Sequence, residues 1–500
     1  MKERQSGILM HISSLPGKYG IGSFGQSAYD FVDFLVRTKQ RYWQILPLGT
    51  TSYGDSPYQS FSAFAGNTHF IDFDLLIKEG LLAEEDVTGL EFGSDKKRVD
   101  YAKIFNVRRP LLEKAVQNFL QHADLQSYHE FVKENASWLD LYVEYMAIKE
   151  HFGLVAWTEW SDEAIRLRKP EALADYRERL SSQMDYHRVT QYFFFQQWLA
   201  LKQYANENHI EIVGDMPIYV AADSADVWAQ PHFFKTDETG KPTCVAGCPP
   251  DEFSETGQLW GNPIYDWEAM DKDGYTWWID RLRESFKIYD IVRIDHFRGF
   301  ESYWEIPAGS ETAATGKWVK GPDYALFKAV KEALGDLNII AEDLGFMTDE
   351  VIALRERTGF PGMKILQFAF NPEDESIDSP HLAPHNSVMY TGTHDNNTVV
   401  GWYRDEIDDA TREYLALYTN RKEYETVPHA MLRTIFASVS FMAIATMQDL
   451  LELDGSARMN LPSTIGGNWE WRMTEDELTE EVESELLSLT TIYRRTNSKL

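Results

Sequence analysis

Three short apolar segments, each followed by acidic residues, constrain the fold more than any other feature of the sequence. The first ends at Asp295, the second at Glu342 and Asp343, and the third at Asp395. Continuous apolar runs of this length are typical of strands that are buried on both faces, as in a parallel sheet. In a (β/α)8 barrel, catalytic side chains come from the ends of several strands and meet at one end of the barrel. The pattern therefore predicts an α/β barrel with carboxylates at its active end.

Five further segments of the sequence are candidates for the remaining strands of such a barrel. We expect them within residues 7–13, 41–48, 209–219, 363–370 and 457–461, which together with the three acidic segments makes eight. A helix is predicted after the first strand, from about Ser27, and another between Thr348 as its N-terminal cap and Gly359 as its C-terminal stop. The alternation of strand and helix is typical of a parallel sheet.

Two segments are too long to be simple strand-to-helix connections. Residues 75–208 are predicted to form a mostly helical insertion between strands two and three. Residues 220–287 are predicted to form a loop-rich insertion, with an active-site lid, between strands three and four. We interpret residues 1–500 as a single elaborated catalytic barrel, and little chain remains after strand eight for a C-terminal β-sandwich domain.

Composition narrows the function and the location. The formal net charge of −31 disfavours nucleic acid and anionic membranes as partners, because both attract positively charged proteins, and it fits a neutral substrate. No segment is long and apolar enough for a transmembrane helix, and the first apolar stretch is too short for a signal peptide. The chain has only two cysteines, Cys244 and Cys248, which is typical of a reducing compartment. We therefore expect a cytoplasmic protein, with no prediction of its oligomeric state.

Two alternative sites, one for a dinucleotide and one for a metal, are disfavoured by the surrounding sequence. Gly20, Gly22 and Gly25 match the G-x-G-x-x-G pattern of dinucleotide-binding proteins, but about seven residues separate them from the first strand. The second strand also ends in Pro-Leu-Gly rather than in the acidic residue that binds the ribose of such cofactors. Three carboxylates at strand ends are also able to bind a divalent metal. No convincing ligand spacing accompanies them, so we expect neither a cofactor nor a metal.

The strand-end carboxylates suit the transfer of a glycosyl group, which needs two carboxyl groups of different protonation. Arg293 and Asp295 are two residues apart, so on a strand they point to the same face. A guanidinium favours the ionised form of a neighbouring acid, so Asp295 suits the nucleophile, although the pair is also consistent with a structural ion pair. Glu342 has no cation beside it in the sequence and suits the acid/base. Asp395, next to His394, is expected to bind sugar hydroxyls and to stabilise a cationic transition state.

Six blocks of sequence, in order, resemble the 4-α-glucanotransferases, also called amylomaltases or disproportionating enzymes, of glycoside hydrolase family 77. These blocks are residues 54–58, 214–219, 249–263, 293–299, 341–345 and 391–396. The resemblance covers essentially the whole chain. It implies a relative of the α-amylases that acts on malto-oligosaccharides, starch or glycogen-derived glucans, without a cofactor and without the C-terminal β-sandwich. It also implies a retaining double displacement with a covalent glycosyl-aspartate.

The resemblance assigns roles to individual residues. It implies that Asp295 is the nucleophile, Glu342 the acid/base and Asp395 the transition-state stabiliser. The residues that it places around the sugar, in the lid or along a longer glucan are Tyr53, Tyr58, Asp215, Phe253, Trp260, Arg293, His296 and His394. Members of the family commonly carry an aromatic residue where this chain has Glu252, so the resemblance gives no prediction for stacking in the lid, product size or cyclisation.

Other functions remain as alternatives. An α-glucan hydrolase or phosphorylase of the amylase superfamily would use the same three carboxylates, and the segment 249–263 distinguishes them because it resembles the lid of the transferases. A non-catalytic glucan-binding protein on a barrel scaffold is a second alternative. It is disfavoured because all three carboxylates are present.

Overall fold

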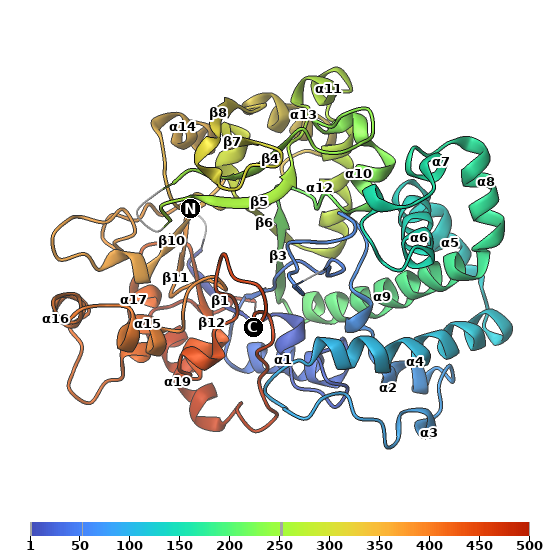
Figure 1. Cartoon of the computed structure of the whole chain (residues 1–500). Coiled ribbons are helices and arrows are strands. Elements are labelled where there is room, and N and C mark those ends of the chain that lie inside the picture. The colour runs from blue at the N-terminus through green and yellow to red at the C-terminus, as the bar shows by residue number, and fades with distance from the viewer. Residues whose placement is uncertain (1–2, 53, 251–253, 500) are drawn as a thin grey trace.

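The structure is a computed structural model that describes residues 3–52, 54–250 and 254–499. Eight parallel strands close into a barrel in which each strand lies beside its neighbours in chain order. These strands are β1 (Gln5–Leu9), β2 (Tyr42–Gln44), β3 (Glu211–Pro217), β6 (Ile291–Asp295), β9 (Ile339–Ala341), β10 (Gly362–Ile365), β11 (Ser387–Tyr390) and β12 (Met442–Thr446). The predicted (β/α)8 barrel is therefore confirmed, and Figure 1 shows helices arranged around it.

The eighth strand is not where the sequence pattern placed it. The barrel closes through β12, which pairs in parallel with β1 from Gln5–Met442 to Leu9–Thr446. Residues 457–461 instead form part of a loop beyond β12. The prediction was wrong because that segment alternates apolar and polar residues, whereas a barrel strand is buried on both faces and reads as a continuous apolar run. All five residues of β12, Met-Ala-Ile-Ala-Thr, are buried.

Most of the described chain between β2 and β3 is helical. Its α-helices are α2 (Phe73–Lys78), α3 (Glu84–Val87), α4 (Tyr101–His122), α5 (Gln126–Glu134), α6 (Ala136–His151), α7 (Glu163–Arg166), α8 (Pro170–Arg179) and α9 (Ser181–Glu207). Figure 1 shows α5 to α8 projecting to one side of the barrel, with the long α9 running back toward it. The division of the chain into a barrel with insertions at 75–208 and 220–287 remains a prediction.

An antiparallel sheet that the sequence analysis did not anticipate lies beside the barrel. Its strands, in the order β5, β4, β7 and β8, are β5 (Gln258–Pro263), β4 (Cys244–Cys248), β7 (Ser302–Pro307) and β8 (Lys317–Lys320). β4 and β5 precede the barrel strand β6, whereas β7 and β8 follow it (Figure 1). The sheet therefore connects the segment before the Asp295 strand to the segment after it, and it brings Trp260 on β5 to the barrel.

The remaining helices mostly alternate with the later barrel strands. They are α1 (Gln26–Arg37), α10 (Ala225–Ala229), α11 (Trp267–Lys272), α12 (Thr276–Ile288), α13 (Tyr324–Leu334), α14 (Asp349–Thr358), α15 (Val399–Asp405), α16 (Asp409–Tyr418), α17 (Val427–Ala437), α18 (Met447–Leu450) and α19 (Glu480–Ile492). The predicted ends of α14 are confirmed, because the Thr348 hydroxyl accepts from the Val351 amide and Gly359 has φ 76°. Within the described residues, none of the helices is long and apolar enough to cross a membrane.

Most of the tryptophan side chains pack in the hydrophobic core. Trp43, Trp157, Trp160, Trp198, Trp228 and Trp278 have less than 2% of their surface exposed. Aromatic rings of this size dominate core packing when buried. Trp260 differs because it is only partly buried and lies beside the end of β6. The high aromatic content is thus explained largely by packing, and few described tryptophans are free to contact a ligand.

Candidate functional site

The predicted site residues meet at the carboxyl-terminal end of the barrel because of the strand register. Asp215 on β3 pairs with Arg293 on β6, and Ile294 on β6 pairs with Ala341 on β9. Asp295 and Glu342 directly follow that last pair, on neighbouring strands. Since adjacent strands lie about 4.8 Å apart, this register brings the two carboxyl-bearing residues side by side.

Arg293 forms the charged centre of the site. Its Nη1 donates to both carboxylate oxygens of Asp215 at 2.8 Å and to Oδ1 of Asp295 at 3.0 Å. Arg293 and Asp215 are almost fully buried, whereas 30% of the Asp295 side chain is exposed. Burial disfavours the guanidinium charge, but the two carboxylates outweigh it and hold the pKa of Arg293 above its ordinary value. The cluster therefore presents one partly exposed carboxylate oriented by a buried cation.

Glu342 is held in a different environment from Asp295. Its Oε2 accepts from the His296 amide at 2.6 Å, and its Oε1 accepts from the Leu344 amide at 2.8 Å. Burial, and then the negative charge of Asp295, raise the pKa of Glu342 from 4.5 to about 7, while Arg293 and the two amides oppose the rise. Near neutral pH, Glu342 is therefore able both to donate and to accept a proton.

Asp395 is fixed in its ionised form. Asn460 Nδ2 donates to Oδ1 of Asp395 at 2.7 Å, and His394 Nε2 lies 3.3 Å from Oδ2. Burial alone would raise the pKa of Asp395, but His394 and Asn460 lower it to about 2. In turn, Asp395 raises the pKa of His394 above its ordinary value against the effect of burial. Asp395 therefore carries a negative charge in the loop that follows β11.

An aromatic wall joins these groups. The Tyr58 hydroxyl donates to Oδ2 of Asp215 at 2.8 Å, and its ring stacks on His394 with centroids 5.0 Å apart. Trp469 packs against both rings, with centroids 5.8 Å from each. Tyr58 thereby connects the loop after β2 to Asp215 on β3 and to His394 in the loop after β11.

The strand β5 closes the site from the side of the antiparallel sheet. The rings of Trp260 and His296 meet in a T-shaped arrangement, with centroids 4.8 Å apart and an interplanar angle of 88°. His296 has φ 55°, an uncommon conformation for a residue other than glycine, and its Nε2 is buried without a hydrogen-bond partner. Burial lowers the pKa of His296 to about 4. Two predicted contacts, Tyr53 and Phe253, lie outside the described residues, as does the lid residue Glu252.

Sequence reasoning missed two residues of this site. Asn460 and Trp469 both lie on the loop that follows β12, part of which the pattern had assigned to strand eight. The backbone N–H of Asn460 also donates to the His394 carbonyl oxygen at 3.0 Å, so Asn460 fastens its loop to both His394 and Asp395. No local signal marks Asn460, because its role depends on a contact with a residue 65 positions away.

The glycines that resemble a dinucleotide-binding motif have a packing role. A Cβ atom on Gly22 would lie 1.8 Å from the Ile12 carbonyl oxygen, and one on Gly25 would lie 2.2 Å from a carboxylate oxygen of Asp72. Gly25 caps the amino-terminal end of α1, where a phosphate would bind in a dinucleotide fold. A carboxylate already lies against that position and would repel a phosphate. Among the described residues, no group of three or more acidic, histidine or cysteine side chains is arranged to hold a metal.

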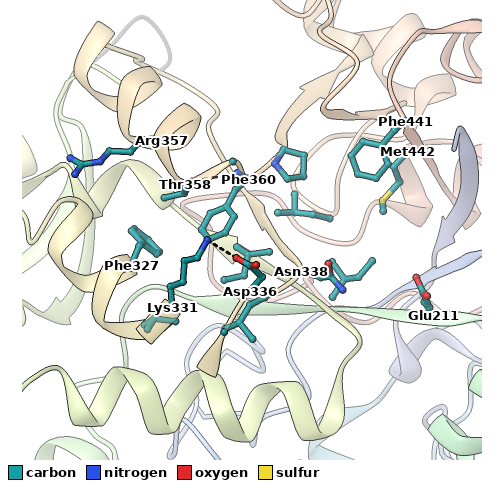
Figure 2. Close-up of a pocket in the computed structure, with 18 of the residues that line it drawn as sticks. Glu211, Phe327, Lys331, Asp336, Asn338, Arg357, Thr358, Phe360, Phe441 and Met442 are labelled. Carbon is teal, nitrogen blue, oxygen red and sulfur yellow. Dashed lines mark hydrogen bonds and ion pairs between the residues drawn. The ribbon is translucent and has the colours of Figure 1, made fainter. Parts of the chain in front are cut away.

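A separate cavity of about 340 Å³ opens at the opposite end of the barrel. Figure 2 shows Glu211, Asn338 and Met442 around it, and these residues lie at the beginnings of β3, β9 and β12. Charges of both signs line it, including Lys331 and Asp336, whose charged atoms lie 2.7 Å apart. It contains none of the strand-end carboxylates and is therefore not the candidate active site.

Comparisons with known proteins agree with the geometry. The sequence profile described as 4-alpha-glucanotransferase matches residues 10–479. The chain is 79% identical to the 4-alpha-glucanotransferase of Streptococcus pneumoniae serotype 4 over 500 residues, which cover 100% of this chain and 99% of the relative. It is 50% identical to that of Clostridium butyricum, covering 97% and 100% of the two chains. The solved amylomaltase from Streptococcus agalactiae in complex with acarbose superimposes with a TM-score of 0.97 at 51% identity, covering 99% and 100%. The chain therefore belongs to the 4-alpha-glucanotransferase family, glycoside hydrolase family 77.

Proposed function

We propose that the protein transfers α-1,4-glucan segments from a donor malto-oligosaccharide to the 4-hydroxyl of an acceptor glucose or glucan by a retaining double displacement. The observation that carries this proposal is the pair Asp295 and Glu342, which are adjacent in register. Asp295 accepts a hydrogen bond from the Arg293 guanidinium, whereas burial and the charge of Asp295 raise the pKa of Glu342 to about 7. The Streptococcus agalactiae relative, solved with acarbose, supports a sugar chain as the ligand. Starch and glycogen-derived glucans are the polymers of the same linkage. A cytoplasmic location remains a prediction from the sequence.

In the first step, a carboxylate oxygen of Asp295 attacks the anomeric carbon of the donor. The bond from that carbon to the O4 of the departing chain breaks, and Glu342 gives its proton to that oxygen. The hydrogen bond from Arg293 keeps the attacking oxygen oriented. For a retaining enzyme, we expect the carboxyl groups of Asp295 and Glu342 to be about 5–5.5 Å apart.

In the second step, Glu342 takes the proton from the 4-hydroxyl of the acceptor. That oxygen attacks the anomeric carbon, and the ester bond to Asp295 breaks. A pKa of about 7 suits Glu342 to both steps, because neither its acid nor its base form is rare at neutral pH. The group loses and regains one proton per cycle, and no external reductant or cofactor is consumed.

Asp395 is proposed to stabilise the positive charge that develops on the sugar in both transition states. Its pKa of about 2 means that it stays ionised throughout the pH range of the reaction. Tyr58, Asp215, His296 and His394 are proposed to hold the sugar that reacts. Trp260 is proposed to contribute to a lid with Phe253, and Tyr53 to hold a longer glucan. A lid that excludes water would favour the hydroxyl of a sugar as the acceptor.

The product profile from maltotriose tests this function. Transfer gives glucose together with maltopentaose and longer chains, while the number of reducing ends stays constant. Hydrolysis gives glucose and maltose with a rising number of reducing ends, and that result would replace the transferase by the amylase-like alternative. No change in maltotriose would favour the glucan-binding alternative instead.

A further inference from the structure

Arg298 is a buried arginine beside the candidate site, and the proposed reaction steps do not use it. It lies in the short helical turn Phe297–Phe300 directly after β6 and is only 5% exposed. Its guanidinium packs over the Trp318 ring at 3.9 Å from the centroid, and its Nη2 donates to the Ser302 hydroxyl at 3.2 Å. Burying a cation is costly unless hydrogen bonds compensate for the lost water. The burial of Arg298 therefore raises the question of what its contacts stabilise.

A second nitrogen of this guanidinium reaches the loop that follows Glu342, whereas its Nε is buried without a hydrogen-bond partner. Nη1 of Arg298 donates to the carbonyl oxygen of Phe346. Two residues earlier in the same loop, the Leu344 amide donates to Oε1 of Glu342 at 2.8 Å. The side chain of Phe346 is 70% exposed, and its ring contacts the same guanidinium, which lies 5.8 Å from the ring centroid.

The loop is anchored independently at its other end. Oδ1 of Asp343 accepts from the Met363 amide at 2.7 Å, and its Oδ2 accepts from Nη1 of Arg355. These bonds fix the residue next to Glu342 against β10 and α14. They do not reach Leu344 or Phe346, whose backbone is fastened toward β6 through Glu342 and Arg298.

We propose that Arg298 is a positioning residue that holds the backbone of residues 344–346 so that the Leu344 amide points at Glu342. This inference rests on the proposed role of Glu342 as the acid/base. Arg298 reaches the carboxyl only through the loop, because its own hydrogen bonds go to Phe346 and Ser302. Trp318 supports it by stacking on the guanidinium.

The proposal has a consequence for the protonation of Glu342. The charged and titratable groups that face this carboxyl are Asp295, which raises its pKa, and Arg293, which lowers it. The amides of Leu344 and His296 also lower it, because they stabilise the ionised form. Losing the Leu344 bond therefore raises the pKa of Glu342, and the alkaline limb of the pH–rate profile moves to higher pH.

The test compares Arg298→Met and Arg298→Lys with the unchanged protein. Lysine keeps the positive charge, but it lacks the planar guanidinium that donates to Phe346 and to Ser302 at the same time. Arg168→Met is a matched control, since Arg168 also stacks on a tryptophan, Trp228, at 4.2 Å, and pairs with Glu144 rather than with the active-site loop. Thermal unfolding shows whether each variant is folded. The probes are maltotriose and α-maltosyl fluoride, whose fluoride leaves without a proton donor.

We expect both Arg298 variants to lose at least tenfold in kcat/KM with maltotriose, mainly through kcat, and to shift the alkaline limb upward. With α-maltosyl fluoride the loss should be less than threefold, because the acid is not needed in that step. Arg168→Met should resemble the unchanged protein in every readout. The proposal is overturned if Arg298→Lys keeps full activity, which would assign the effect to charge alone, or if both donors lose activity equally. A failure of the proposed transferase function would be distinguished from a failure of the Arg298 proposal, because the unchanged protein would then hydrolyse maltotriose.

Discussion

The protonation of Glu342 gives the most specific prediction. Burial and Asp295 raise its pKa from 4.5 to about 7. If Glu342 must donate a proton to the departing chain, kcat/KM for maltotriose should fall above that pH. About half of the enzyme carries the acid at pH 7 and about a tenth at pH 8, so the rate should fall roughly tenfold for each further pH unit. A glutamate at its ordinary pKa would be only about 3% protonated at pH 6.

The assay is the initial rate of glucose release from maltotriose between pH 5 and pH 9, at substrate concentrations far below KM. His394 is a second group whose raised pKa is able to produce an alkaline limb. α-Maltosyl fluoride separates the contributions of Glu342 and His394 to the alkaline limb. Fluoride departs without an acid, so a limb caused by Glu342 disappears, whereas a limb caused by His394 stays. A limb near pH 7 with maltotriose that is absent with the fluoride supports Glu342. A rate that already falls about tenfold for each pH unit from the acidic end of this range, as an acid of pKa 4.5 would give, or an equal limb with both donors, would refute the reasoning.

Three further predictions follow from individual contacts. Asp395→Asn should lower the pKa of His394, measured by NMR titration of its ring, because Asp395 is the main group that raises it; an unchanged titration would show that the pair is not coupled. Tyr58→Phe removes the bond to Asp215 and should reduce kcat/KM by about ten- to a hundredfold, the usual worth of a hydrogen bond to a charged group, and equal rates would contradict this. Thr348→Ala removes a helix cap and should lower the free energy of unfolding in urea by about 1 kcal/mol without changing kcat, and a loss of activity would mean that the cap also shapes the site.

The barrel and its carboxylates were predictable because their signals are local. A strand buried on both faces reads as an apolar run, and the residue at its carboxyl-terminal end is visible directly after it. Asp295 ends β6, Glu342 directly follows β9, and Asp395 lies in the loop after β11, so all three are at the carboxyl-terminal end of the barrel. The ends of α14 were predictable for the same reason, since Thr348 and Gly359 act within one helical turn.

Features that depend on distant contacts were not predictable in the same way. Asn460 donates to Asp395 across 65 residues of chain, and nothing in its neighbourhood distinguishes it from any loop asparagine. The antiparallel sheet pairs β4 with β7, which lie on either side of β6 in the sequence, so no local pattern reveals the pairing. The raised pKa of Glu342 likewise comes from burial and from Asp295 on another strand.

The central claim is that Asp295 forms a covalent bond to the sugar, and trapping that bond tests it most directly. In Glu342→Gln, α-maltotriosyl fluoride should still react with Asp295, but the second step should be slow because the base is missing. After rapid quenching and proteolysis, mass spectrometry should find a maltotriosyl group on the peptide that contains Asp295, and the additional substitution Asp295→Asn should abolish it. A maltotriosyl group on another residue, or rapid turnover of the fluoride by the doubly substituted protein, would contradict the account.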